Sequence, residues 1–214
     1  MRHSSRNYLL RRILIAALIL CLFAASLPFS FRLIQRLSES EEVAALRQVE
    51  IPTWIEVDLI GINGAARRGT SLELVGGIVI HYIGNPATTA TQNRNYFDNP
   101  DTTVSAHFVI GLEGEIIQCV PLNEKSSASN HRNADTISIE VCHPDETGVF
   151  TDASYRALVR LSAWLCHECG LDTEAIIRHY DVTGKTCPRW FVEDEEAWEK
   201  FRRDVASALE KGEF

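Results

Sequence analysis

The sequence has no internal repeat and no low-complexity tract, which excludes repeat architectures such as solenoids. It also lacks an excess of basic residues, because 21 Lys and Arg stand against 29 Asp and Glu, for a formal net charge of -8. This balance argues against a nucleic-acid-binding protein, which is usually basic. Apolar residues make up 45% of the 214 positions, enough for one folded domain with a core and an appendage.

Acidic residues are absent before Glu39, and this part of the chain differs from the rest. Four arginines precede the apolar run 13–29, whose length is near the lower limit for spanning a bilayer, about 17 residues. The arginine excess places the N-terminus in the cytoplasm and the following chain outside, by the positive-inside rule. We therefore expect residues 1–36 to form a cytoplasmic tip and one N-terminal transmembrane helix that serves as a signal anchor in the cell membrane.

A cleaved signal peptide is the alternative for this segment, and the protein would then be secreted. Ala24–Ser26 make a poor small-residue cleavage site and Pro28 follows them, so the sequence favours the anchor. A buried core helix does not suit such unequal flanks. Residues 37–52 are rich in charged residues and lack turn signals, which predicts a helical or flexible stalk, and residues 53–214 predict the folded domain.

Alternating and β-branched residues predict four strands, two of them joined by a hairpin turn at Leu112–Gly114. The predicted strands are Gly77–Ile83, Ser105–Gly111, Glu115–Val120 and Thr136–Cys142. Helical periodicity predicts a short helix that begins near Thr88 or Thr89 and two long amphipathic helices. The long helices are Asp152–Cys169, capped by Thr151 or Asp152 and followed by Gly170, and about Asp194–Lys211. This mixture indicates an α/β domain with a sheet between helices.

Reactive side chains concentrate around His81, around Glu140 and in the stretch 178–188. A catalytic zinc ion needs three protein ligands and one open position for water. His81, His179 and Cys187 could supply two imidazoles and one thiolate, a set that leaves the bound water acidified. Their spacing matches no common zinc motif, and a single histidine or cysteine is more often structural. Both interpretations stay open on these residues alone.

Four motifs, in this order along the chain, resemble those of the type-2 N-acetylmuramoyl-alanine amidases. That family also includes the phage lysozyme-type amidases and the animal peptidoglycan-recognition proteins. The motifs are Ile78–His81, Ser105–Phe108, Ser138–Glu140, and Arg178–Asp181 followed by Lys185–Pro188. The resemblance covers roughly residues 74–204. It implies a mixed central β-sheet flanked by helices, one Zn²⁺ per chain, and hydrolysis of the amide between N-acetylmuramic acid and L-alanine in peptidoglycan.

The resemblance also implies a role for each site residue. Zinc is bound by His81, His179 and Cys187, Glu140 is the general base, and Lys185 stabilises the oxyanion. Strand alternation agrees, because Glu140 lies on the face opposite the isoleucines of the segment 136–142. The alternatives are a solvent-facing Glu140 on an edge strand and an ordinary surface lysine at position 185.

The chain departs from the phage lysozyme-type relatives at Ala106, where they carry a tyrosine. No hydroxyl can assist there, so the base is assigned to Glu140 alone. We interpret His107 as a packed or hydrogen-bonded histidine outside the zinc set. The polar loop 130–133 is interpreted either as a contact to sugar or peptide or as an ordinary solvated loop.

Cys166 and Cys169 look like a metal or redox pair, but both lie on the apolar face of a predicted helix, so packing explains them. Together with Cys119 and Cys142 they permit up to two disulfides in an oxidising compartment, with no pairing implied.

Three other functions compete with the amidase. A non-catalytic peptidoglycan-binding module on the same fold is disfavoured, because such relatives typically lose the cysteine ligand that Cys187 supplies here. An unrelated zinc peptidase and a structural membrane protein are the other two. The expected partners are peptidoglycan and, through the N-terminal helix, the membrane, with no nucleic acid and a monomeric chain. The sequence has no cell-wall-binding repeat, so the anchor is expected to hold the enzyme near its substrate.

Overall fold

The computed structural model describes residues 40–62 and 64–214. The predicted cytoplasmic tip and transmembrane helix lie outside these residues and stay predictions. Within the described ranges, no helix is both long enough and apolar enough to cross a membrane.

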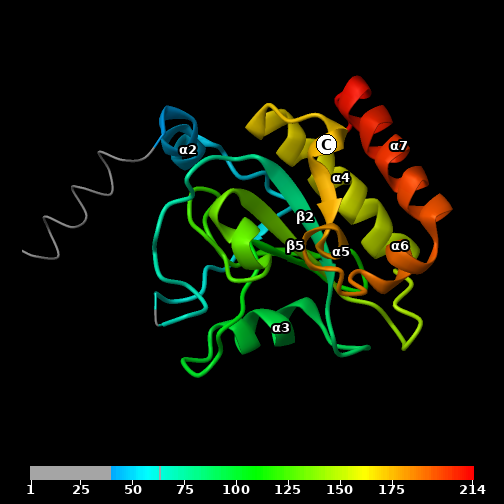
Figure 1. The fold of residues 1–214 in the computed structure, drawn as a ribbon, viewed down its shortest axis with the longest axis horizontal. Helices are drawn as coiled ribbons and strands as arrows, with labels where there is room; N and C mark the ends of the chain where they lie inside the picture. Colours follow the sequence, from blue (N-terminus) through cyan, green and yellow to red (C-terminus); the bar gives the residue numbers. More distant parts are fainter. Residues whose placement is uncertain (1–39, 63) are drawn as a thin grey trace, which may run out of the picture. The chain divides into compact units, whose positions relative to one another are not determined.

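A six-stranded sheet forms the centre of the domain (Figure 1). Its strands, in spatial order, are β1 (Glu56–Val57), β4 (Ile116–Gln118), β3 (Phe108–Ile110), β5 (Thr136–Val141), β2 (Gly77–Tyr82) and β6 (Ile176–Arg178). β3 and β4 are antiparallel, and every other neighbouring pair is parallel. The mixed sheet and the β3–β4 hairpin are therefore as the sequence predicts.

Helices cover both faces of this sheet (Figure 1). α4 (Asp152–Cys169) and α7 (Glu195–Lys211) pack against each other on one face, and α3 (Ala90–Phe97) contacts β3 and β4 from the other. The remaining short elements are α2 (Glu41–Ala45), α5 (His179–Thr183), α6 (Arg189–Glu193) and the 3₁₀ turns η1 (Leu46–Gln48), η2 (Asn130–Ala134) and η3 (Thr173–Ala175). The prediction of a sheet between helices is confirmed.

The predicted helix ends are confirmed by their caps. Thr89 begins α3 with a capping box, in which its side chain accepts the Gln92 N–H at 3.1 Å and Gln92 accepts the Thr89 N–H at 2.9 Å. Thr151 caps α4 by accepting the Ser154 N–H at 3.0 Å. Gly170 ends α4 with a φ of 64°, the left-handed conformation that favours glycine.

The pleat of β2 and β5 sorts their side chains between two faces. Ile80 and Ile139 are register partners and belong to the larger core, which α4 and α7 complete. His81 and Glu140 are the next register partners, so they project from the opposite face of the sheet. The alternation that predicted the orientation of Glu140 is therefore present in the structure.

The segment predicted as a stalk, 37–52, is described from residue 40 and packs there against the domain. Val43 is fully buried and Leu46 is 6% exposed, and both belong to the larger core. Their spacing of three residues places them on one face of the α2–η1 turn. Residues 40–52 therefore belong to the same compact unit as the folded domain.

Candidate metal centre and active site

Three elements bring the predicted zinc ligands to one end of the sheet. His81 lies near the end of β2, and His179 follows directly after β6 as the first residue of α5. β2 and β6 are parallel neighbours with Ile80 opposite Arg178, so both strands end at the same edge. Cys187 lies in the loop that follows α5.

The loop after α5 returns the chain to the two histidines. Gly184 ends α5 with a φ of 76°, a left-handed turn that a residue with a side chain adopts only with strain. The Tyr180 N–H donates to the Cys187 carbonyl at 2.9 Å and closes the loop. These contacts bring the Cys187 thiol back to the site.

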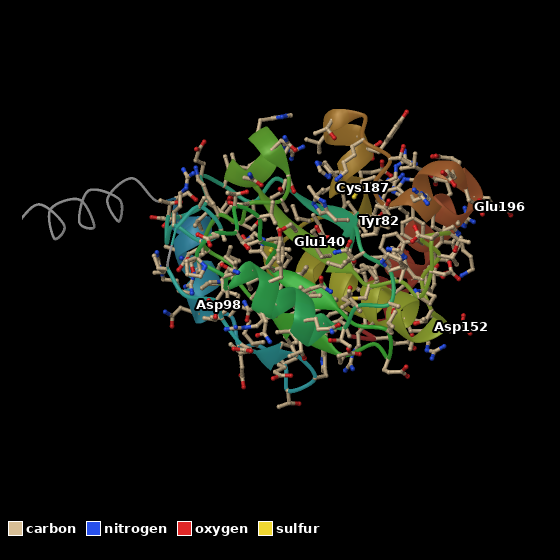
Figure 2. The ribbon with its side chains drawn as sticks, turned by 90° about the horizontal axis from the view of Figure 1, so that it is seen from below. Tyr82, Asp98, Glu140, Asp152, Cys187 and Glu196 are labelled. Carbon is tan, nitrogen blue, oxygen red and sulfur yellow. The ribbon has the colours of Figure 1, made fainter. Side chains whose placement is uncertain are left out.

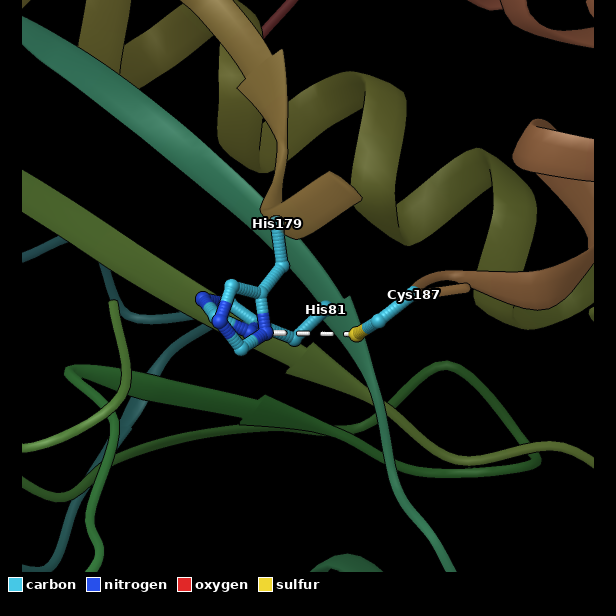
Figure 3. Close-up of side chains that lie close together, drawn as sticks. All are labelled: His81, His179 and Cys187. Atoms are coloured by element: carbon cyan, nitrogen blue, oxygen red, sulfur yellow. Dashed lines mark hydrogen bonds between the residues drawn. The ribbon is translucent and has the colours of Figure 1, made fainter. Parts of the chain in front are cut away.

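The ligand atoms of His81, His179 and Cys187 lie within 4.8 Å of one another (Figure 3). His81 Nδ1 is 3.9 Å from Cys187 Sγ, and the two imidazole centroids are 4.5 Å apart. All three residues are buried, with exposed fractions of 2%, 8% and 2%. Two imidazoles and one thiolate at this spacing suit a single Zn²⁺ ion, whose catalytic sites use three such ligands. The structure thus brings together the three residues that the sequence singled out.

Burial sets the protonation of the three ligands. It lowers the pKa of His81 well below 6.5, and the nearby His179 and Lys185 lower it further. Burial also lowers the pKa of His179, again with a contribution from Lys185. Both imidazoles are therefore neutral at pH 7, the form that binds a metal. Burial raises the pKa of the Cys187 thiol to about 12, so a cation is needed to stabilise the thiolate.

The outer nitrogen of each imidazole contacts a neighbouring residue of one loop. His81 Nε2 is 3.0 Å from Ser129 Oγ, and His179 Nε2 is 3.0 Å from Asn130 Oδ1. The loop 130–133 is therefore more than an ordinary solvated loop, because Asn130 contacts the candidate metal ligand His179. Nothing in the sequence links Ser129 or Asn130 to the histidines, since the contacts span 48 and 49 positions.

Glu140 lies beside the cluster and points into the same cleft, which Cys187 also lines (Figure 2). Its Oε1 is 4.0 Å from His81 Nδ1, and its buried Oε2 has no hydrogen-bond partner among the described residues. Burial raises the pKa of Glu140 to about 8, against the opposing effect of the Lys185 charge. A carboxylate held like this, with one oxygen unpaired, can accept a proton from a group in the cleft.

Lys185 is exposed and lines the same cleft. Its positive charge lowers the pKa values of His81, Glu140 and His179, which shows that it acts on the whole cluster. The lysine is thus a cation at the mouth of the site.

The cleft has a volume of about 1080 Å³ and extends well beyond the cluster. Its more distant part is lined by residues of other segments, including Arg68, Phe97 and Val104. Glu140 is the only acid that lines it within the described ranges, alongside two cations, Arg68 and Lys185. The part of the cleft lined by Arg68, Phe97 and Val104 was not predicted from the sequence.

His107 and Ala106 are fully buried and line no part of the cleft. The His107 ring accepts the Ser138 N–H at Nδ1, at 3.0 Å, and its Nε2 donates to the Glu124 carbonyl, at 2.8 Å. His107 is therefore a packed, hydrogen-bonded histidine, as the sequence predicts.

The cysteines of the described residues are all free thiols, so the two disulfides that the sequence permits are not formed among them. Burial raises the pKa of Cys166 and of Cys169 to about 12, which keeps both thiols protonated. Packing explains this pair better than redox or metal chemistry.

Comparison with known proteins identifies related sequences. The family model described as N-acetylmuramoyl-L-alanine amidase matches residues 72–190, which include all five predicted site residues. The chain is 31% identical over 169 residues to N-acetylmuramoyl-L-alanine amidase CwlL of Bacillus licheniformis, covering 71% of this chain and 46% of CwlL. It is 30% identical over 171 residues to N-acetylmuramoyl-L-alanine amidase BlyA of Bacillus subtilis strain 168, covering 70% and 46%. The chain spans about half the length of the curated relatives it matches.

Solved structures show the same fold. The catalytic domain of XlyA, an amidase of Bacillus subtilis strain 168, superposes with a TM-score of 0.62 at 26% identity, covering 71% of this chain and 98% of that domain. PlyL superposes with a TM-score of 0.63 at 22% identity, covering 71% and 96%, which supports the fold alone.

Proposed function

We propose, from the premise that this chain belongs to the N-acetylmuramoyl-L-alanine amidase family, that it hydrolyses the amide between N-acetylmuramic acid and L-alanine in peptidoglycan. The resemblance found in the sequence is confirmed by the family match. The observation that carries the proposal is the buried cluster of His81, His179 and Cys187 in a large cleft, with an unpaired Glu140 oxygen beside it.

The cluster fits one zinc ion by its donor set and its spacing. His81 and His179 would supply neutral imidazoles and Cys187 a thiolate, leaving a position for a water or a substrate oxygen. When bound, zinc would acidify that water and polarise the scissile carbonyl. The burial of the three ligands holds them where solvent does not compete for them.

Glu140 is proposed as the general base and then the general acid. Its unpaired Oε2 is available to take a proton from the attacking water. The same carboxyl group then protonates the leaving amine of L-alanine. Without a metal, burial gives this group a pKa of about 8 and favours its protonated form at pH 7. The Lys185 charge lowers that pKa, and a zinc ion bound beside it would lower it further, which favours the ionised form that acts as the base.

Lys185 is proposed to stabilise the negative charge that develops on the carbonyl oxygen of the scissile amide. Its ammonium group lies at the mouth of the cleft, and its charge already acts on Glu140 and on both histidines. A fixed cation contributes most when it meets charge that is present only in the transition state.

A non-catalytic peptidoglycan-binding module is the alternative. Such a module needs the cleft but neither the thiolate nor a base. The simultaneous presence of Cys187, Glu140 and Lys185 around one cleft favours the enzyme.

The direct test is mass spectrometry of purified peptidoglycan after incubation with the protein. The amidase releases peptides with a free N-terminal L-alanine and leaves intact glycan chains, and a chelator abolishes this release until Zn²⁺ is added back. Binding to the wall without release of peptide would support the binding module. Cleavage of casein with no effect on the wall would instead indicate a peptidase.

Membrane anchoring with the domain outside the cell is a further proposal, supported by the charge asymmetry around residues 13–29. Fractionation of cells, followed by protease treatment of intact spheroplasts, distinguishes an anchored protein from a secreted one. A monomer is expected and is checked by light scattering.

A further inference from the structure

We propose that Ser129 and Asn130 are a paired positioning device, which fixes the tautomer and ring orientation of both histidine ligands from one loop. The inference rests on the proposed metal centre and goes beyond its ligands. It concerns two adjacent residues that contact two histidines from distant parts of the chain, one near the end of β2 and one at the start of α5.

The contact to His81 leaves one ring nitrogen for the metal. Ser129 Oγ is 3.0 Å from His81 Nε2, and Ser129 itself is 1% exposed. The other ring nitrogen, Nδ1, faces Cys187 Sγ at 3.9 Å and Glu140 Oε1 at 4.0 Å. Metal binding at Nδ1 requires the ring hydrogen on Nε2, and Ser129 Oγ lies where it can accept that hydrogen.

The contact to His179 also leaves one ring nitrogen for the metal, and its partner atom can only accept a hydrogen bond. Asn130 Oδ1 is 3.0 Å from His179 Nε2, and an amide oxygen can only accept a hydrogen bond. His179 must therefore carry its hydrogen on Nε2 and present Nδ1 without one. A metal-binding histidine that donates its other N–H to a fixed acceptor is oriented more firmly and is a more basic ligand.

The backbone of the loop is itself constrained. Asn130 has a φ of 55°, and asparagine is one of the few residues with a side chain that adopts this conformation readily. Asn133 Oδ1 accepts the N–H groups of Ala128 and Ser129, at 3.0 and 2.6 Å. The Asn133 side chain thus holds the backbone that leads into the uncommon conformation of Asn130, directly beside the cluster. A loop held in this way suits a positioning role.

The pairing has a consequence that single contacts would not have. Because Ser129 and Asn130 are consecutive, a shift of this loop moves both supports together. The two histidines are thereby coupled through η2, which begins at Asn130, although they are 98 positions apart.

The test uses the full-length protein in detergent with Zn²⁺ as the probe. Ser129→Ala and Asn130→Gly each remove one acceptor. Glycine suits the positive φ, so Asn130→Gly removes the amide without straining the backbone. Asn130→Asp restores an acceptor oxygen at the same place. His131→Ala is the matched control, since His131 is an exposed neighbour in the same 3₁₀ turn and does not line the cleft.

Competition with a chromophoric chelator gives the zinc dissociation constant of each variant. Ser129→Ala and Asn130→Gly are expected to weaken zinc binding by about 10- to 100-fold, the usual effect of losing an outer partner of a metal-bound histidine. Asn130→Asp and His131→Ala are expected to retain the affinity of the unmodified protein. The absorption spectrum of the Co²⁺-substituted protein should change in the first two variants and not in the last two.

Histidine ring ¹⁵N NMR of the zinc-free protein tests the inference independently of metal binding and of activity. His81 in Ser129→Ala, and His179 in Asn130→Gly, should lose the single Nε2–H tautomer that the unmodified protein shows. Variants that keep both this tautomer and the original zinc affinity, with unchanged melting temperatures, would overturn the positioning role. A protein that binds zinc and responds as expected, yet releases no peptide from peptidoglycan, would contradict the proposed function and leave this inference standing.

Discussion

His81 and Glu140 are direct register partners on the parallel strands β2 and β5, and His81 Nδ1 lies 4.0 Å from Glu140 Oε1. A candidate ligand and the candidate base thus come from rigid elements rather than from flexible loops. Their separation is fixed by the spacing of neighbouring strands, about 4.8 Å. Positions set in this way give the site a geometry that varies little.

Substitution of Glu140 by glutamine should separate chemistry from metal binding. The amide keeps the shape of the side chain but cannot accept the proton, so peptide release should fall by about 10²- to 10⁴-fold. Zinc content, measured by atomic absorption, should stay at that of the unmodified protein. Glu113→Gln, an exposed residue on the β3–β4 turn, serves as control. Undiminished peptide release by the Glu140 variant would remove it from the mechanism.

Lys185→Ala should reduce the rate of the chemical step with little effect on zinc binding. Loss of one fixed group that stabilises an oxyanion typically costs about 10²- to 10³-fold in kcat. Lys185→Arg keeps the positive charge and should restore part of the rate. Steady-state kinetics on a soluble muropeptide provide the measurement. If Lys185→Ala raises only KM, the lysine binds substrate and does not stabilise the transition state.

Acid should destabilise the domain through His107. Burial lowers the pKa of this imidazole from 6.5 to about 4, so the unfolded chain takes up the proton first as the pH falls. The contribution to stability is therefore complete above pH 6.5 and is lost progressively toward pH 4. Its upper limit is about 3 kcal/mol in the free energy of unfolding.

Urea unfolding at a series of pH values checks the His107 prediction. His107→Gln should lower the free energy of unfolding at pH 7, because the bonds to Ser138 and Glu124 are disturbed, but should flatten its fall between pH 6.5 and pH 4. His131→Gln, at an exposed position, should keep the original slope. Equal slopes in all three proteins would contradict the prediction.

A truncated protein that begins at Ile51 should be less stable than one that begins at Ser40. The shorter protein loses Val43 and Leu46, two buried side chains of the core, each worth about 1.5–3 kcal/mol in the free energy of unfolding. Thermal melts of the two proteins provide the comparison. Leu46→Ala in the longer protein should reproduce part of the loss, and equal melting temperatures would show that α2 is dispensable.

Much of the fold follows from local signals in the sequence. The ends of α3 and α4 were predictable because Thr89, Thr151 and Gly170 are caps with a local mechanism. β1, with two residues, and β6, with three, were not predicted. The packing of Val43 and Leu46 was not predicted, because their burial depends on contacts with residues distant in the sequence.

Only those residues of the candidate site that lie within the family motifs could be predicted from the sequence. The residues His81, Glu140 and Cys187 stand in those motifs, and the structure brings them to one cleft. Ser129 and Asn130 could not be found in this way, since their partners lie about fifty positions away and hydrogen bonds of this kind leave no periodic pattern.

The order of the cluster along the chain bears on when the protein can become active during its synthesis. The last member, Cys187, comes 106 positions after His81, and α7 follows it to complete the core. A chain synthesised only as far as α5 has the two imidazoles without their thiol. We therefore expect the metal site to form only once Cys187 and the elements packed around it have folded.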